Sequence, residues 1–263
     1  MQLTRAITAV TLLAFTAACR ESATETQTPA DALTRDVAVV SGDAAYEDVG
    51  VIYAQIGTFG VPAGDVGRAT GWTGPCPYDA GTGRFTCPGQ TREGRTVSRS
   101  YAFQDATGTP QSAYDGATTA SANFRSSMAG SVERDGWSAT MSHERDMTQS
   151  GLAGAETSHT INGTGSSVES RSRHTDGGVR TYRMSSVATF TNVVVPFPRA
   201  RGAWPLSGTI TRSVTAAREG AVGSVTHQRM ATTTFNGTRF ASMTVGDRTF
   251  TLDLATGRVV REP

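Results

Sequence analysis

The sequence predicts a mainly β protein with a large antiparallel meander sheet, curved or forming a half-barrel, and one short N-terminal helix. Composition is the first reason: 263 residues include 40 Thr, 29 Gly and only eight Leu, and Thr favours strands whereas Leu favours helices. The second is a series of turn signals between stretches of alternating side chains. The 24 basic and 23 acidic residues nearly cancel, which argues against a chain disordered throughout.

Residues 1–18 are typical of a secretory signal peptide. Arg5 precedes an apolar run from Ala6 to Ala18, which is too short to span a bilayer comfortably. The run ends in Thr16-Ala17-Ala18-Cys19, which resembles the lipobox of bacterial lipoproteins, although Thr16 stands where Leu is usual. An ordinary signal peptide, cut after Ala18 and leaving a free thiol, is the alternative.

The lipobox resemblance implies that Cys19 becomes the new N-terminus and carries a diacylglycerol anchor and palmitate. Arg20 follows Cys19, and in the sorting pattern of enteric bacteria a residue other than Asp there favours the outer membrane. We therefore expect a lipid-anchored protein of the bacterial cell envelope that faces the periplasm or the cell surface.

Residues 19–28 are polar and read as a flexible tether. Thr28, Pro29 and Asp31 form a helix-start signature of N-cap, first-position proline and acid in the first turn. An apolar stripe follows to about Val40, where Ser41-Gly42 is expected to end the helix. The pattern in 46–56 fits either a helix or a strand.

The segment 29–94 is expected to combine this helix with a Gly- and Pro-rich part that packs on the main domain. It contains Cys76 and Cys87, and in an exported chain such a pair favours a disulfide. A zinc site is disfavoured because Cys-x-x-Cys and nearby His are lacking, and the sequence indicates no other metal and no cofactor.

Residues 95–263 read as an antiparallel β domain. Asn236-Gly237 predicts a two-residue hairpin turn between two strands, and Asn162-Gly163 is read as another Asn-Gly turn. Ser, Thr and Arg occupy both faces of several strands, notably in 157–173. Because an unpaired polar group in a dry core costs about 1–3 kcal/mol, a wide sheet in contact with water is expected.

No catalytic motif stands out. Without Lys, a Schiff-base enzyme and a P-loop NTPase are excluded, and a net charge of +1 argues against a nucleic-acid partner. In His143-Glu144 the two side chains diverge on a strand. The other histidines, His159, His174 and His227, are scattered.

Arginines are the remaining functional clue. Such side chains bind carboxylates, phosphates or lipid headgroups in bidentate fashion. The simpler interpretation is that Arg takes the place of Lys throughout the chain and forms local pairs with Asp and Glu. The candidates for anion or headgroup contact are Arg171, Arg173, Arg180 and Arg183.

The expected function is that of a non-enzymatic, membrane-anchored envelope lipoprotein. Its role is structural or the binding of a partner or ligand, such as an envelope protein or a lipid, and carriage of a lipid or lipoprotein between sheet and helix is one version. The alternative is a secreted hydrolase using His and Asp/Glu from separate strands.

Overall fold

A computed structural model describes residues 29–56, 76–92, 94–134, 137–175, 178–198, 200, 202–220 and 223–261. In these ranges the chain forms one helix and one open antiparallel sheet of 13 strands. Strands adjacent in sequence are adjacent in the sheet, from β1 to β13, and only β4 leaves this path to pair with β3. The predicted mainly β meander is therefore confirmed. The elements are α1 Pro29–Ile56, β1 Tyr78–Asp79, β2 Arg84–Arg92, β3 Arg95–Gln104, β4 Pro110–Gln111, β5 Ser121–Arg134, β6 Trp137–Ser150, β7 Ser158–Thr175, β8 Gly178–Pro196, β9 Ser207–Gly220, β10 Gly223–Thr234, β11 Phe240–Val245, β12 Arg248–Asp253 and β13 Val259–Arg261.

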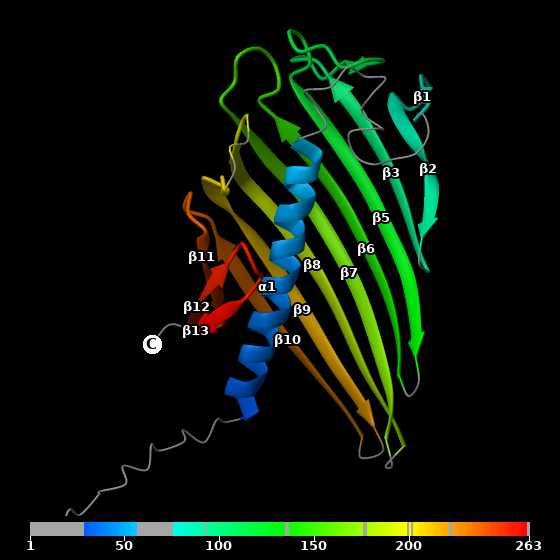
Figure 1. Cartoon of the computed structure of the whole chain (residues 1–263), viewed down its shortest axis with the longest axis vertical. Helices are drawn as coiled ribbons and strands as arrows, with labels where there is room; N and C mark the ends of the chain where they lie inside the picture. Colours follow the sequence, from blue (N-terminus) through cyan, green and yellow to red (C-terminus); the bar gives the residue numbers. More distant parts are fainter. Residues whose placement is uncertain are drawn as a thin grey trace, which may run out of the picture.

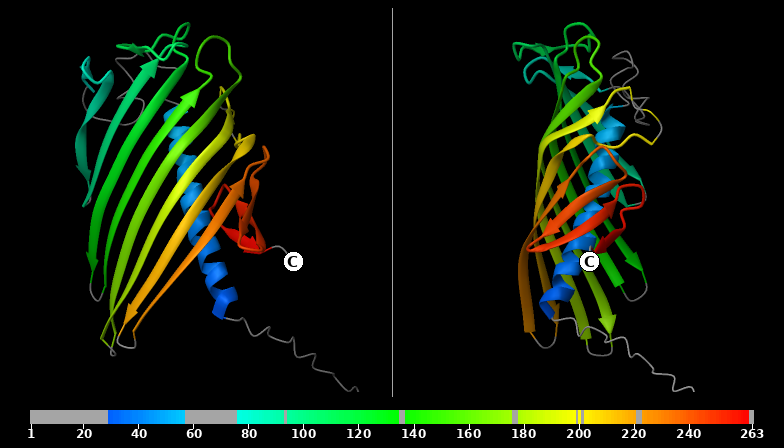
Figure 2. Two further views of the ribbon diagram at one scale, coloured as in Figure 1. Left: turned by 180° about the vertical axis from the view of Figure 1, so that it is seen from behind. Right: turned by 90° about the vertical axis from the view of Figure 1, so that its left-hand side faces the viewer.

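The sheet curves around α1, which lies along its concave side (Figures 1 and 2). We call the face toward α1 the inner face and the opposite one the outer face. Strands β7 and β8 have 18 and 19 residues, so at about 3.3 Å per residue each is roughly 60 Å long. Their long antiparallel ladders satisfy backbone hydrogen bonds even where both faces are polar.

Helix α1 is longer than the sequence predicts, because Ser41-Gly42 does not end it and 46–56 continues it. Gly42 is buried, and a Cβ there would lie 2.3 Å from Cγ2 of Val259. The glycine therefore allows close packing of the helix on the sheet. Ala45, Val49 and Ile52 are all buried and continue the apolar stripe at helical spacing.

Two clusters form the core of the inner face. The larger lies between α1 and the sheet from β6 to β12 and includes Ile52, Phe190 and Met243. The smaller lies on β2, β3 and β5, where Phe85 stacks on Tyr101 with ring centroids 4.8 Å apart. Apolar residues are thus concentrated on the inner face.

The Asn-Gly predictions are wrong in detail. Asn236-Gly237 lies in a five-residue connection, 235–239, and the Asn236 side chain accepts hydrogen bonds from Thr238. Asn162-Gly163 lies inside β7 at a bulge rather than in a turn. A Cβ on Gly163 would lie 2.3 Å from the Asp146 carbonyl oxygen, so close approach of β6 explains that glycine.

The cysteine-containing segment is part of the sheet. Cys76 and Cys87 form a disulfide, and β1 pairs with β2, which pairs with β3. The sheet therefore begins at Tyr78, before residue 95. Among the described residues, no helix is long and apolar enough to cross a membrane.

Candidate binding site beside helix α1

A buried charge cluster joins α1 to the sheet. Asp48 of α1 is fully buried and faces two arginines, Arg145 of β6 and Arg212 of β9. Its Oδ1 accepts from Nε of Arg145 at 2.8 Å and lies 2.7 Å from Nη2, and its Oδ2 accepts from Nη2 of Arg212. One carboxylate thus binds two guanidinium groups from strands on either side of β7 and β8.

Backbone and hydroxyl oxygens accept hydrogen bonds from Nη1 of both arginines. Nη1 of Arg145 donates to the carbonyls of Glu144 and Ser166, at 2.9 and 3.1 Å. Nη1 of Arg212 donates to Oγ of Ser186 at 2.9 Å. Buried charges persist in proteins when they are paired and hydrogen-bonded in this way.

Small residues make room for the two guanidinium groups. Arg145, Gly165, Ala188 and Arg212 lie in one row across β6 to β9. A Cβ on Gly165 would lie 2.8 Å from Cδ of Arg145. The glycine therefore lets the Arg145 side chain extend along the inner face toward Asp48.

Glu47 and His143 also interact electrostatically with this cluster. Burial lowers the pKa of Arg212, while Asp48 and, more weakly, Glu47 oppose this shift. Burial also lowers the pKa of His143, and the charge of Arg145 lowers it further. The charges of Glu47, Asp48 and Glu169 oppose this shift, so His143 lies within the electrostatic reach of the cluster.

A pocket of about 550 Å³ opens beside this cluster, between α1, the β8–β9 connection and the end of β12. This volume falls within the roughly 300–1,000 Å³ typical of small-molecule sites. Of its lining residues only Glu47 is charged, and three are aromatic. The lining consists of Tyr46, Glu47, Val49, Gly50, Tyr53, Trp204, Leu254 and Ala255.

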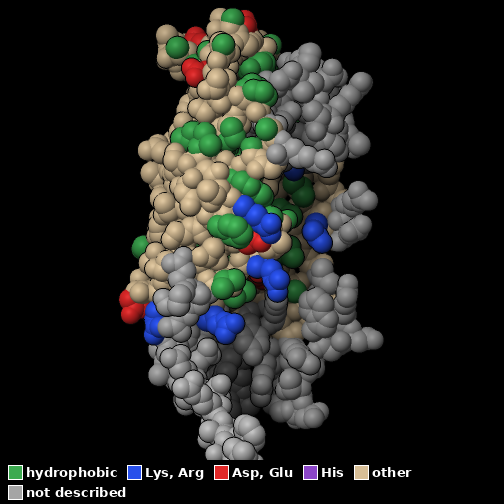
Figure 3. Space-filling view, turned by 60° about the vertical axis from the view of Figure 1, so that its left-hand side comes forward, with side chains coloured by type: hydrophobic (Ala, Val, Ile, Leu, Met, Phe, Trp, Pro, Cys, Tyr) green, Lys and Arg blue, Asp and Glu red, His purple; other side chains and the backbone are tan. Residues whose placement is uncertain are grey.

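The surface on one side of the molecule mixes basic and apolar groups. Figure 3 shows arginine side chains in the middle of this face, with an acidic side chain between them and hydrophobic side chains around them. Such a mixture suits a ligand with both polar and apolar parts.

A second buried polar pair lies on β6 and β7. Gln149 and His159 are both buried, and Nε2 of Gln149 is 2.5 Å from Nδ1 of His159. The imidazole stacks on Phe197 with centroids 4.4 Å apart, and burial lowers its pKa. His159 therefore behaves as a neutral core residue.

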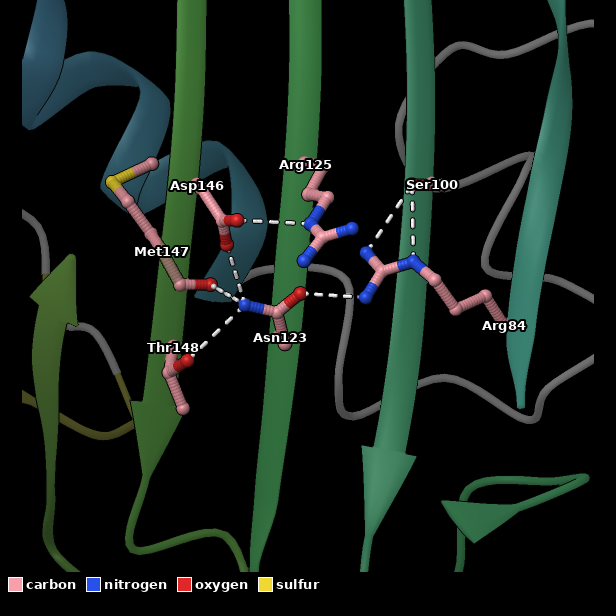
Figure 4. A network of polar contacts seen from close by, with 7 residues as sticks. All are labelled: Arg84, Ser100, Asn123, Arg125, Asp146, Met147 and Thr148. Carbon is pink, nitrogen blue, oxygen red and sulfur yellow. Dashed lines mark hydrogen bonds and ion pairs between the residues drawn. The ribbon is translucent and has the colours of Figure 1, made fainter. Parts of the chain in front are cut away.

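The outer face carries a polar network across β2 to β6 (Figure 4). Nδ2 of Asn123 donates to Asp146 at 2.7 Å, and its Oδ1 accepts from Arg84 at 2.7 Å. Arg125 donates to the other Asp146 oxygen at 2.9 Å. The network is partly exposed and links side chains of neighbouring strands, so we assign it a structural role in the sheet.

The candidate residues of the sequence fall in three places. Cys19 and the side chains of Arg171, Arg173, Arg180 and His174 lie outside the described residues. Arg183 is exposed on β8. His143, His159 and His227 lie on β6, β7 and β10 in different cross-strand rows, paired with Ser167, Val195 and Ala216 respectively. In the described part of the chain no group of His, Cys, Asp and Glu could hold a metal.

Sequence reasoning missed Asp48, because it ended the helix before that residue. With α1 continued to Ile56, Asp48 stands among the apolar positions Ala45, Val49 and Ile52. A lone acid on the buried face of a helix predicts a basic partner on the opposing surface.

Comparison with known proteins gives no relative for this chain: no family model, curated protein or solved structure matches it.

Proposed function

We propose that this chain is a non-enzymatic lipoprotein of the bacterial envelope, anchored through Cys19, that binds a small amphiphilic ligand in the pocket beside α1. The anchor rests on the lipobox resemblance, and Arg20 directly after Cys19 favours the outer membrane. The pocket of about 550 Å³ is the observation that carries the binding role.

The lining selects the class of ligand. Val49, Leu254 and the rings of Tyr46, Tyr53 and Trp204 offer apolar contact, and aromatic faces also attract cations. Glu47 supplies the only charge of the lining. We therefore propose a ligand with an acyl or other apolar part and a neutral or cationic head.

Gly50 provides a direct way to block the pocket. It lines the pocket from α1, and a Cβ placed on it meets no atom within 4 Å. Gly50→Phe therefore fills the pocket without a clash at its base. Val39→Phe is the matched control, because Val39 is an exposed position of the same helix that does not line the pocket.

The probe is N-phenyl-1-naphthylamine, a neutral molecule whose fluorescence rises in an apolar site. We expect saturable binding to the wild type and to Val39→Phe, and at least tenfold weaker binding to Gly50→Phe. Equal binding to all three proteins would contradict the proposed site.

Competition below micellar concentrations tests the proposed head group. Dodecyltrimethylammonium should displace the probe at lower concentration than dodecanoate. Glu47→Gln should bring the two displacing concentrations closer together. Stronger displacement by dodecanoate would show that Glu47 does not set the preference.

A further inference from the structure

We infer that the pocket beside α1 binds the trimethylammonium head of its ligand among the rings of Tyr46, Tyr53 and Trp204, with Glu47 as the counter-charge. This inference rests on the proposed function, which leaves the head group either neutral or cationic, and it names the chemical group. Aromatic rings that surround a cation are a common means by which proteins recognise quaternary ammonium ions.

The two tyrosines stand on one face of α1. They are seven residues apart, which is two helical turns and about 10 Å along the helix axis. A cation between these two levels can therefore lie within about 6 Å of both ring centroids, the range of cation–π attraction. Tyr53 is buried and Tyr46 is 44% exposed, so one ring belongs to the inner part of the pocket and the other to its rim.

Gly50 leaves the space between the two tyrosines open. It stands four residues after Tyr46 and three before Tyr53, on the same helical face, and a Cβ placed on it meets no atom within 4 Å. Trp204 reaches the pocket from the β8–β9 connection and packs, partly buried, against the larger core cluster. The third ring therefore comes from a different element and is supported by the core.

The charge of the lining favours a cation. Glu47 is its only charged residue, and no described lining residue is basic. The carboxylates closest to the lining in sequence are already paired with arginines. Asp48 binds Arg212, and Oδ1 of Asp253 at the end of β12 accepts from Nε of Arg239 at 2.6 Å. The charge of Glu47 is therefore not cancelled by a basic group of the lining.

The lining also distinguishes a quaternary from a primary ammonium group. A primary ammonium carries three N–H donors, and removing them from water without enough acceptors costs free energy. A trimethylammonium group has no N–H donor, and its methyl groups can contact Val49, Leu254 and the aromatic rings. A simple ion pair with Glu47 would favour the primary ammonium, so the preference between these two cations separates the two modes of binding.

The test compares two surfactants of equal chain length and charge, dodecyltrimethylammonium and dodecylammonium, below their micellar concentrations. Each displaces N-phenyl-1-naphthylamine from the full chain carrying Cys19→Ser, in which acyl groups of the chain itself cannot occupy the pocket. We expect dodecyltrimethylammonium to displace the probe at a concentration at least fivefold lower. Tyr46→Leu should reduce this preference below twofold, whereas the control Tyr46→Phe, which keeps the ring, should retain it.

Trp204→Leu is a second variant and should also reduce the preference. Equal displacement by both surfactants in the parent chain, or a full preference in both leucine variants, would overturn the inference while leaving the proposed function intact. Absence of probe binding to the parent chain would overturn the proposed function and this inference with it.

The trimethylammonium group occurs both on lipids and on free solutes such as choline. Calorimetric titration with dodecylphosphocholine and with choline distinguishes these two sources. We expect dodecylphosphocholine to bind at least tenfold more tightly, as an amphiphilic ligand should. Equal affinity would assign the pocket to a free solute and contradict the lipid source.

Discussion

Asp48 and Arg212 stand 164 residues apart in sequence and form an ion pair in which both side chains are buried. With Arg145 on the other Asp48 oxygen, this pair fixes the middle of α1 over the inner face. Breaking it by removing the carboxylate leaves two buried guanidinium groups without their counter-charge, and we expect Asp48→Asn to lower the free energy of unfolding by about 3–5 kcal/mol.

Urea denaturation measures this loss. Glu144→Gln is a suitable control, because Glu144 is an exposed acid beside Arg145 in sequence and its substitution should cost less than about 0.5 kcal/mol. A loss for Asp48→Asn as small as that of the control would show that the cluster does not hold the helix.

Two glycines of α1 should respond in opposite directions. A Cβ at Gly42 would lie 2.3 Å from Val259, whereas a Cβ at Gly50 meets open space. We expect Gly42→Ala to lower the free energy of unfolding by about 1–3 kcal/mol through overpacking. Gly50→Ala should raise it by about 0.5–1 kcal/mol, because alanine favours the helix.

Thermal melting of the two alanine variants is the measurement. Melting temperatures that move in the same direction would contradict the packing of α1 on β12 and β13.

His159, which is buried, and His143, which is half-buried, predict that stability falls in acid. Burial lowers the pKa of both His143 and His159 below the ordinary value of 6.5. The unfolded chain therefore takes up protons on these histidines more readily than the folded chain does. The stabilisation that their neutral imidazoles provide is complete above pH 6.5 and is lost as the pH falls toward their pKa values in the folded chain.

Unfolding free energies at pH 7.5 and 5.0 test this sign. His159→Gln should show a smaller difference between the two pH values than the wild type, even if it is less stable at both. An unchanged difference in both His159→Gln and His143→Gln would show that these imidazoles do not cause the pH dependence.

The disulfide closes a short loop at the edge of the sheet. Cys76 and Cys87 are separated by 11 residues, and closing a loop of that size stabilises by roughly 3 kcal/mol in the chain-entropy model. We expect Cys76→Ser/Cys87→Ser to lose about that much, measured by urea denaturation without reductant. Adding reductant should then destabilise the wild type and leave the variant unchanged.

Local sequence patterns predicted the sheet well. The turn signals between stretches of alternating side chains predicted a meander, and the observed register of β11 and β12 is regular. The cysteine pair likewise predicted the bond between Cys76 and Cys87. These features depend on contacts between residues near in sequence.

The candidate site depends on contacts between distant residues, and these were not predicted. Gly42 resembles a helix end in sequence, but its role is to approach Val259, more than 200 residues away. Arg212 looks like any other arginine of a polar strand until α1 places Asp48 against it.

Metabolic labelling with a palmitate analogue is the most direct test of the lipid anchor, on which the proposed envelope function depends. The wild-type chain expressed in a bacterium should be labelled, whereas Cys19→Ser should not be labelled. Cys76→Ser/Cys87→Ser controls for thiol acylation elsewhere and should be labelled like the wild type. Undiminished labelling of Cys19→Ser would contradict the assignment of this chain as a lipoprotein.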